Sequence, residues 1–318
     1  MKKTLELILR PKEWEDYIGQ EKIKNNLRLI IKAAKQREEP CDHLLFHGQA
    51  GLGKTTLAHI IAKEMEAQIK TTSGPSLEKT GDMAAILTNI EPHEILFIDE
   101  IHRMNRAVEE VLYPALESRK LHLVVGKGPS AKTLSIDLPP FTVVGATTKA
   151  NLLSSPFRSR FGAIFKLDYY NEEDIKKIIE RSAKILDIST KEEALQKLAS
   201  ASRFTPRTAN RLLKRCRDWA QVHKDNVIDK ESVEKTLEMM EIDELGLEEM
   251  DRTLLETIIE RFNGGPVGIQ SLAASLNEDP GTVEEVYEPF LIQIGLLKRT
   301  PTGRVATKKA YNHLKNKD

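Results

Sequence analysis

A glycine-rich segment that ends in lysine and threonine is the first place where residue types and spacing predict chemistry. Residues 48–55 fit the pattern GxxxxGK[ST] between an apolar run and a helix-like segment. Gly51 and Gly53 let backbone N–H groups converge on phosphate, and the dipole of the following helix adds attraction. Lys54 is expected to reach the β- and γ-phosphates, and the Thr55 hydroxyl to ligate Mg²⁺. The segment predicts an ATP/ADP and Mg²⁺ site; the alternative is a glycine-rich turn that only opens a helix.

Two adjacent acids follow a later apolar run. Asp99 and Glu100 come directly after residues 95–98, and a carboxylate at the end of a strand beside the P-loop strand can hold Mg²⁺. Asp99 is predicted to take this metal role, and Glu100 to orient and deprotonate the attacking water. Thr147 ends a further apolar run and is a candidate for aligning that water. A structural turn fits its residue type equally well.

Two arginines outside these motifs are candidates for sensing the γ-phosphate. Arg160 ends the first part of the chain, and Arg207 stands near the start of a predicted helix. In a ring, one arginine can reach a neighbour's nucleotide while another senses the nucleotide of its own subunit. Such an arginine finger accelerates hydrolysis by roughly 10³- to 10⁵-fold in GTPases. From residue type alone, Arg160 is more often the partner in a surface ion pair.

The elements that must position these residues form three predicted domains. They are a large α/β P-loop domain at 1–167, a small helical lid at 168–240 and a winged-helix domain at 241–318. In the first, near-continuous apolar strands are expected at 43–47, 94–98 and 141–145. Such strands between helices indicate a parallel sheet with helices on both faces. Alternating residues predict a projecting β-hairpin over 121–138, turning at 126–129.

Capping residues mark the helices of the other two domains. Asn171, Thr190 and Thr205 are the predicted caps in the helical lid, the last followed by proline at the first helical position. In the last domain, helices are expected at 254–262 and 269–276, and a third is capped at Thr282 and ended by Gly295. Two strands then flank a turn at 300–303. Three helices followed by a hairpin are typical of a winged helix.

Composition excludes several classes of protein. The 318 residues are 40% apolar and 30% charged, which indicates a globular protein of two or three domains. No apolar run reaches the ~20 residues that span a bilayer, and the first residues lack the apolar core of a signal peptide. Cys41 and Cys216 are the two cysteines, too few for a disulfide scaffold or a zinc site. We expect a cytoplasmic protein without a membrane partner.

Charge is segregated near the end of the chain. The formal net charge is zero, so no global field attracts nucleic acid. Residues 298–318 nevertheless carry seven Lys or Arg and one acid, whereas 241–297 carry thirteen acids and two arginines. Local positive charge of this kind is what DNA phosphates bind. With few aromatic residues beside it, backbone tracking is favoured over base stacking. A solvated basic tail and a protein-binding winged helix are the alternatives.

The chain resembles the RuvB family, the bacterial branch-migration motors of the AAA+ type. The motifs that carry the resemblance cover nearly the whole chain: residues 9–12, 17–20, 51–58, 97–103, 145–148, 155–162, 205–213, 264–268 and 288–293. The late motifs distinguish this family from other AAA+ proteins far better than the P-loop does. Two segments depart from the family pattern. Gln49 and Ala50 replace two prolines, and residues 117–119 lack the usual acidic-aromatic sequence, so only Glu117 is carried over from them.

The resemblance implies a set of site residues and partners. Arg160 would be the finger that reaches the neighbouring subunit of a homo-hexamer, and Arg299 and Arg304 would contact duplex DNA of Holliday junctions. The hairpin would grip RuvA, and RuvC is a further candidate partner. The implied nucleotide contacts are Leu9, Arg10, Tyr17, Ile18, Gly51, Gly53, Lys54, Thr55, Thr56, Glu117, Arg160, Tyr170 and Arg207.

Four functions compete on this basis. The first is an ATP-driven DNA translocase that moves Holliday junctions in recombination and repair. The others are a clamp-loader-like switch, a protein remodeller and a scaffold that holds nucleotide without turnover. Lys54, Asp99, Glu100 and Arg160 are all present, which argues against the scaffold. The C-terminal winged helix argues against the switch and the remodeller.

Overall fold

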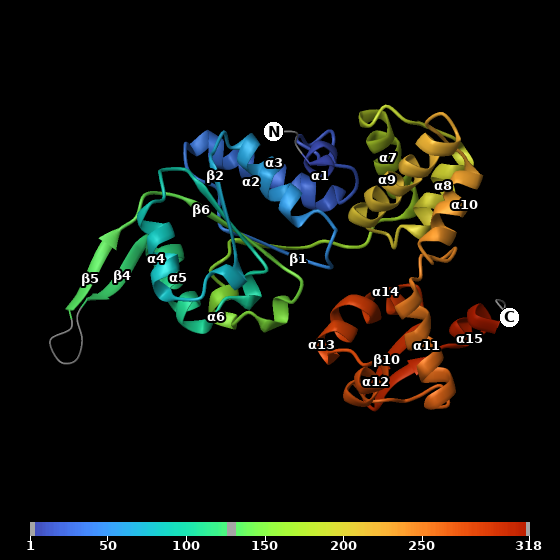
Figure 1. Cartoon of the computed structure of the whole chain (residues 1–318). Helices are drawn as coiled ribbons and strands as arrows, with labels where there is room; N and C mark the ends of the chain where they lie inside the picture. The colour runs from blue at the N-terminus through green and yellow to red at the C-terminus, as the bar shows by residue number, and fades with distance from the viewer. Residues whose placement is uncertain (1–3, 126–131, 316–318) are drawn as a thin grey trace. The chain divides into compact units, whose positions relative to one another are not determined.

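The computed structural model describes residues 4–125 and 132–315, and the chain divides into two compact units, Met1–Tyr170 and Asn171–Asp318 (Figure 1). The first unit is built on a five-stranded parallel sheet in the order β2-β3-β6-β1-β7. Its strands are β1 Leu44–His47, β2 Ile69–Ser73, β3 Ile95–Asp99, β6 Thr142–Thr147 and β7 Ala163–Lys166. The three predicted strands are β1, β3 and β6, which are almost wholly buried. The two edge strands were not predicted.

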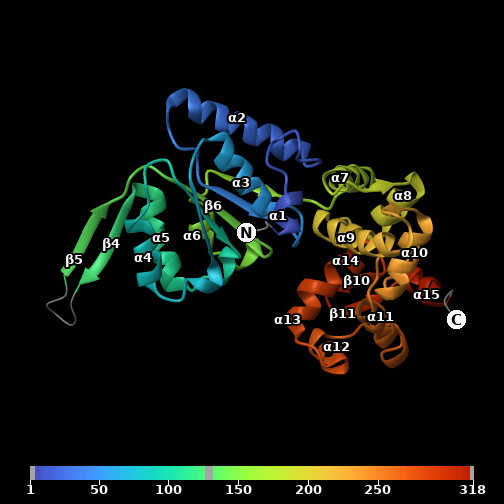
Figure 2. The same cartoon turned by 45° about the horizontal axis from the view of Figure 1, so that its top comes forward.

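Helices cover both faces of this sheet, as the apolar strands predicted. Figure 2 shows α2 and α3 on one face, and α4 and α5 on the other. Sheet residues such as Leu96, Ile98 and Val143 pack with α4 and α5 into one buried cluster. The helical segments of the unit are α1 Leu5–Leu9, α2 Glu21–Arg37, α3 Lys54–Glu64, η1 Gly74–Ser76, α4 Thr80–Thr88, η2 Ile101–Arg103, α5 Arg106–Ser118, η4 Ala150–Leu152 and α6 Ser155–Arg158.

The predicted hairpin is present and projects from the α4–α5 side (Figure 1). Strands β4 Lys120–Val125 and β5 Lys132–Asp137 pair antiparallel from Lys120 opposite Asp137 to Val125 opposite Lys132. Its base is anchored by the buried side chains of Leu121 and Leu138. The predicted turn at 126–129 lies outside the described residues.

The second unit begins with the helical segment of the predicted lid. Asn171 and Thr205 cap their helices as predicted, with Asn171 Oδ1 accepting from Asp174 N at 2.7 Å. The prediction for Thr190 is wrong: Lys191 is the cap, because Thr190 pairs with Ile228 in a two-residue strand. The elements are α7 Glu172–Ile185, β8 Ser189–Thr190, α8 Glu192–Ala201, α9 Pro206–His223, β9 Val227–Ile228 and α10 Lys230–Met239.

The rest of the second unit is the predicted winged helix. Its third helical segment is capped by Asp279, not Thr282, because Pro280 occupies the first helical position and the Asp279 carboxylate accepts from Gly281 N at 2.7 Å. A final helix, α15, follows the wing and was not predicted. The elements are α11 Glu249–Arg261, α12 Ile269–Leu276, α13 Pro280–Thr282, the π-helical η5 Val283–Tyr287, α14 Glu288–Gln293, β10 Leu297–Thr300, β11 Gly303–Ala306 and α15 Lys308–Lys315.

Among residues 4–125 and 132–315, no helix is long and apolar enough to cross a membrane.

A histidine at the start of β1 connects three elements of the first unit. Val143 N donates to His43 Nδ1 at 2.9 Å, so the proton of the neutral ring lies on Nε2, which is 3.2 Å from the carbonyl oxygen of Leu116. Burial is the main cause that lowers the pKa of His43 from 6.5 to about 4. Protonation would replace the acceptor at Nδ1 with a donor.

We expect His43 to make folding stability depend on pH. Between pH 6.5 and 4, His43 binds a proton in the unfolded chain but not in the folded chain. The folding free energy is therefore unaffected by His43 above about pH 6.5, and the folded state loses stability as the pH falls to 4. The loss is on the order of 3 kcal/mol. Urea unfolding of the chain and of its non-titrating variant His43→Gln at several pH values measures this. Equal pH slopes for the two proteins would contradict the assignment.

Candidate functional site

The P-loop joins β1 to α3 and has the backbone that its glycines predicted. Gly48, Gly51 and Gly53 have φ angles of 145°, 82° and 102°, which side chains rarely adopt. Gly48 N donates to the carbonyl oxygen of Thr147 at 3.2 Å, which ties the loop to the end of β6. The Lys54 ammonium lies across the loop, donating to the carbonyl oxygens of Gly48 at 2.7 Å and Gln49 at 2.9 Å. Thr55 and Thr56 follow in the first turn of α3.

Two tyrosines from opposite ends of the unit meet behind this loop. The hydroxyls of Tyr17 and Tyr170 lie 3.3 Å apart and are 3.4 and 3.2 Å from the carbonyl oxygen of Leu52. Burial, with Tyr170 beside it, raises the pKa of Tyr17 well above its ordinary value, so the hydroxyl stays protonated. Leu9 is also buried, while Arg10 and Ile18 are partly exposed. The fold thus brings Tyr17 and Tyr170 to the P-loop, and the roles of Leu9, Arg10 and Ile18 stay predictions.

The acids of β3 and the threonine of β6 end at the same edge of the sheet as β1, since all three strands are parallel. One expectation needs correction: β3 is not beside the P-loop strand, because β6 lies between them. This order puts Thr147, which is fully buried, between the P-loop and Asp99. Glu100 directly follows β3 in a left-handed conformation, with φ 45° and ψ 46°.

A histidine that the sequence analysis did not single out connects the base candidate to this threonine. His102 Nδ1 lies 2.8 Å from Thr147 Oγ1 and 3.2 Å from Glu100 Oε2. The Thr148 hydroxyl donates to the same Glu100 oxygen at 3.3 Å. One carboxylate oxygen of Glu100 is therefore held from two sides. The sequence signal for His102 was its place in the motif of residues 97–103, two residues after Glu100.

Arg160 lies just beyond α6 and is held by residues of α5. One of its terminal nitrogens donates to Glu117 Oε2 at 3.0 Å, and its guanidinium carbon is 4.6 Å from the centre of the Tyr113 ring. The Tyr113 hydroxyl bonds to Glu109 and to Ser154, the latter at 2.9 Å. The Arg160 side chain is 24% exposed. The ion pair suggested by residue type is present, and it joins two predicted site residues.

The predicted DNA residues of the wing differ in accessibility. The Arg299 side chain is 49% exposed, whereas that of Arg304 is 10% exposed and donates from Nε to Glu288 Oε1 at 2.7 Å. Glu288 is fully buried and also pairs with Arg299. The Arg304 guanidinium is therefore engaged inside the domain, and its contact with DNA stays a prediction. In the lid, Arg207 is exposed in the first turn of α9.

A P-loop on a parallel sheet, acids on β3, a threonine on the strand between them, a helical lid and a winged helix together define an AAA+ ATPase. The family models agree along the chain. The Holliday junction DNA helicase RuvB P-loop domain matches residues 9–167, the RuvB AAA lid domain 170–243 and the RuvB C-terminal winged helix domain 244–315. The chain belongs to the RuvB family.

Solved structures are similar over the same extent. The Thermotoga maritima RuvB Holliday junction branch migration motor shares 52% identity, covering 97% of this chain and 98% of that one with a TM-score of 0.90. A variant of the same Thermotoga protein matches with 52% identity, 96% and 98% coverage and a TM-score of 0.89. The fold and the family thus agree, and the P-loop domain binds nucleotide.

Gly53→Ala is expected to weaken ATP binding. The added Cβ would lie 2.7 Å from the Tyr17 hydroxyl, at a φ of 102° that alanine rarely adopts. Strain of ~1–3 kcal/mol in such a conformation corresponds to roughly a ten- to hundredfold loss of affinity. Titration with a fluorescent ATP analogue measures it. The matched control is Gly81→Ala in α4, where a Cβ meets no atom within 4 Å. Unchanged affinity in Gly53→Ala would show that the loop accommodates a side chain there.

Proposed function

We propose that this chain hydrolyses ATP as one subunit of a homo-hexameric ring and uses the energy to drive branch migration of Holliday junctions. The observation that carries the proposal is the meeting of the P-loop, Glu100 and Thr147 at one edge of the sheet, in a chain that ends in a winged helix. Family membership supports the junction as substrate. We assign ATP hydrolysis to residues 1–167, the lid to 168–240 and the winged helix to 241–318. We place the motor in the bacterial cytoplasm.

The P-loop residues suit a magnesium–nucleotide complex. Residues 4–125 and 132–315 contain no group of three or more His, Cys, Asp or Glu that would hold a metal alone. Mg²⁺ in nucleotide sites uses one or two protein ligands and the substrate's own phosphates, which fits Thr55 and Asp99. Bound there, the ion would neutralise charge on the phosphate oxygens. Lys54, already at the loop, would exchange backbone carbonyls for the β- and γ-phosphates.

We assign Glu100 as the general base. Its Oε2 is held by His102 and Thr148, so the other oxygen, Oε1, is the one assigned to the proton of the attacking water. A base must be fixed within hydrogen-bond reach of that water to contribute its ~10²–10⁴-fold effect. Thr147, joined to the same histidine, is assigned to alignment of the water.

The remaining residues are assigned to nucleotide recognition. We assign Tyr17 and Tyr170, which contact the P-loop, together with Leu9, Arg10 and Ile18 to the base and sugar. Arg207 is assigned to sensing from the lid. Arg160, with Glu117 beside it, is the finger directed to the neighbouring subunit's γ-phosphate. A finger that acts between subunits requires a ring.

The wing and the hairpin are assigned to the partners. Arg299 is half exposed on β10 and is proposed to contact DNA phosphate, while Arg304 is proposed to support it through Glu288. The β4–β5 hairpin, where Leu134 is 52% exposed, is proposed to grip RuvA. RuvC is a further partner to which we assign no surface. A clamp-loader-like switch or protein remodeller remains the competing function, and no specific contact favours it.

The first experiment is steady-state ATPase with and without duplex DNA across a salt titration, with a synthetic four-way junction and RuvA. We expect DNA to stimulate turnover, the stimulation to fade with salt because phosphate contacts do, and the junction to resolve into duplex arms only with ATP. Glu100→Gln should bind ATP and lose roughly 10²-fold or more in turnover. ATPase indifferent to DNA, with a stationary junction, would favour the protein-directed switch.

Mixed rings test whether Arg160 acts on the neighbouring subunit. Arg160→Ala should bind ATP normally and lose on the order of 10³-fold in turnover. Lys54→Ala subunits keep their finger but lose phosphate contacts. Mixing the two inactive variants should restore part of the turnover, because intact Arg160 meets intact P-loops at some interfaces. Mixtures of the unaltered chain with Lys54→Ala control for ring cooperativity. If that control stays active while the mixed variants remain inactive, the finger does not act in trans.

A further inference from the structure

The loop between α8 and α9 of the lid inserts two side chains into the winged-helix domain. Arg203 and Phe204 have φ angles of 55° and 54°, a left-handed conformation that is uncommon for residues other than glycine. Phe204 packs against the core cluster of the winged helix, with its ring 6.4 Å from that of Phe290. The Arg203 guanidinium carbon lies 4.3 Å from the centre of the same Phe290 ring. Such paired backbone outliers persist only where surrounding contacts hold them.

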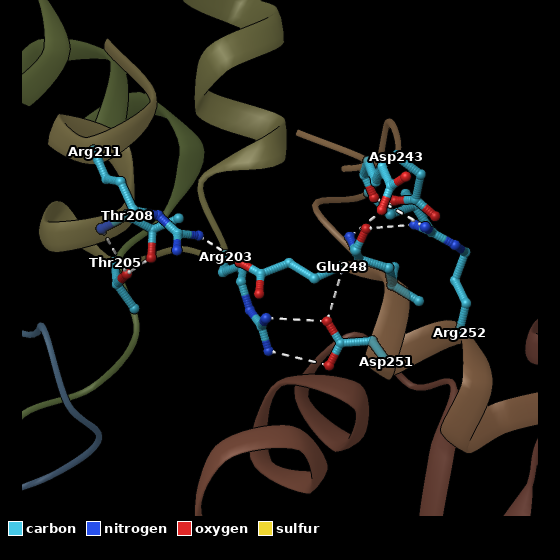
Figure 3. A network of polar contacts seen from close by, with 11 residues as sticks. Arg203, Thr205, Thr208, Arg211, Asp243, Glu248, Asp251 and Arg252 are labelled. Atoms are coloured by element: carbon cyan, nitrogen blue, oxygen red, sulfur yellow. Dashed lines mark hydrogen bonds and ion pairs between the residues drawn. The ribbon is translucent and has the colours of Figure 1, made fainter. Parts of the chain in front are cut away.

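Arg203 ends in a buried ion pair with the first turn of α11, which Figure 3 shows. Its two terminal nitrogens lie 3.0 and 3.4 Å from the two carboxylate oxygens of Asp251. The Asp251 side chain is fully buried and that of Arg203 is 14% exposed. Asp251 Oδ2 also accepts from Glu248 N at 2.9 Å, capping α11. Pulling Arg203 away while Asp251 stays covered would leave a buried carboxylate without its cation, so this contact resists sliding of the lid against α11.

The same loop leads directly to the candidate nucleotide sensor. Arg207 follows Arg203 by four residues, in the first turn of α9, whose cap is Thr205. Four residues further on, Arg211 pairs with Glu248 of the winged helix (Figure 3). Residues four apart lie on one face of a helix. Arg207 therefore shares a face of α9 with Arg211, and it lies in the sequence between two residues, Arg203 and Arg211, that contact the winged helix.

The connector between α10 and α11 is fixed as well. Arg252 donates to the carbonyl oxygens of Leu247 at 2.8 Å and Glu241 at 2.9 Å. One oxygen of Asp243 accepts from Leu247 N at 2.9 Å, and the other lies 2.7 Å from His313 Nε2 on α15. A connector bonded to itself and to the last helix leaves little freedom for a hinge between lid and winged helix.

We propose that Arg203 and Asp251 are positioning residues that make the lid and the winged helix one rigid body. When the lid moves during the ATPase cycle, the winged helix then moves with it by the same rotation. Neither residue touches nucleotide or DNA in this role. The proposal rests on the proposed motor function for its purpose, although the rigidity itself is testable without it.

The test of rigidity uses spin labels on full-length chain. The labels are attached at Val222→Cys on α9 and Val286→Cys in the winged helix, because these valines are 75% and 53% exposed. The native Cys41 and Cys216 are buried and are not expected to react with the label. The expected result is one narrow distance distribution that is the same with ADP and with a non-hydrolysed ATP analogue. Adding Arg203→Met and Asp251→Asn together, which removes both charges and leaves no unpaired one, should broaden it. A distance that changes with nucleotide in the parent overturns the proposal.

The test of coupling compares junction movement per ATP hydrolysed, using the ring with RuvA on a synthetic four-way junction. The Arg203→Met, Asp251→Asn double variant should keep DNA-stimulated ATPase within about twofold and lose tenfold or more in movement per ATP. The Arg203→Lys variant, which keeps the positive charge, should retain part of the movement per ATP. The matched control is Lys197→Met, whose partner Glu234 lies within the lid. Unchanged movement per ATP in the double variant, or equal loss of both activities, overturns the coupling role. A parent chain that does not move junctions refutes the proposed motor instead, and the spin-label result still decides rigidity.

Discussion

The structure of the first unit depends on where the parallel strands end. Phosphate binding requires several backbone N–H groups in one concave loop, and such a loop forms between a strand and a helix. With β6 paired directly to β1, the P-loop glycine Gly48 bonds to the Thr147 carbonyl group. The Thr147 hydroxyl lies 2.8 Å from His102, which in turn contacts Glu100. The order of the strands therefore links a change at the P-loop to the base candidate through two hydrogen-bonded groups. An adjacent β1 and β3 would leave no room for this intermediary.

Continuous apolar runs were enough to predict β1, β3 and β6, because strands buried on both faces need apolar side chains at every position. The same reasoning could not find β2 or β7. Both strands lie at the edges of the sheet and have no fully buried residue: β7 alternates between partly buried and exposed positions, and β2, Ile69–Ser73, has too few apolar residues to stand out. The cap predictions failed where tertiary contacts intervened. Thr190 pairs with Ile228 in a short strand and so does not cap α8. Thr282 does not cap the third helical segment of the winged helix, because Asp279 caps it three residues earlier and Pro280 begins it.

The site was predictable where its residues are contiguous and unpredictable where they are distant. The P-loop residues, the acids of β3 and the tyrosine positions came from motifs. The ion pairs between these carboxylates and the arginines did not, because Glu117 is 43 residues from Arg160 and Asp251 is 48 residues from Arg203. No spacing rule connects such pairs; only the packing of α5 against the segment after α6, or of the lid against α11, brings them together.

Burial decides which of these arginines can change partners. Glu117 is 67% exposed, so its pair with Arg160 contributes only ~0–1 kcal/mol and a phosphate can replace the carboxylate at little cost. Asp251 is fully buried, and breaking such a pair typically costs about 3–5 kcal/mol because the remaining charge has no solvent. Arg299 combines both situations, since it is half exposed but pairs with the buried Glu288, which Arg304 also neutralises. Arg299 can therefore leave its carboxylate without depriving Glu288 of a cation, whereas the buried Arg304 and Arg203 cannot be released without breaking a buried pair. An arginine can thus exchange its partner where its carboxylate is exposed or keeps a second cation, and it stays in place where a buried carboxylate depends on it.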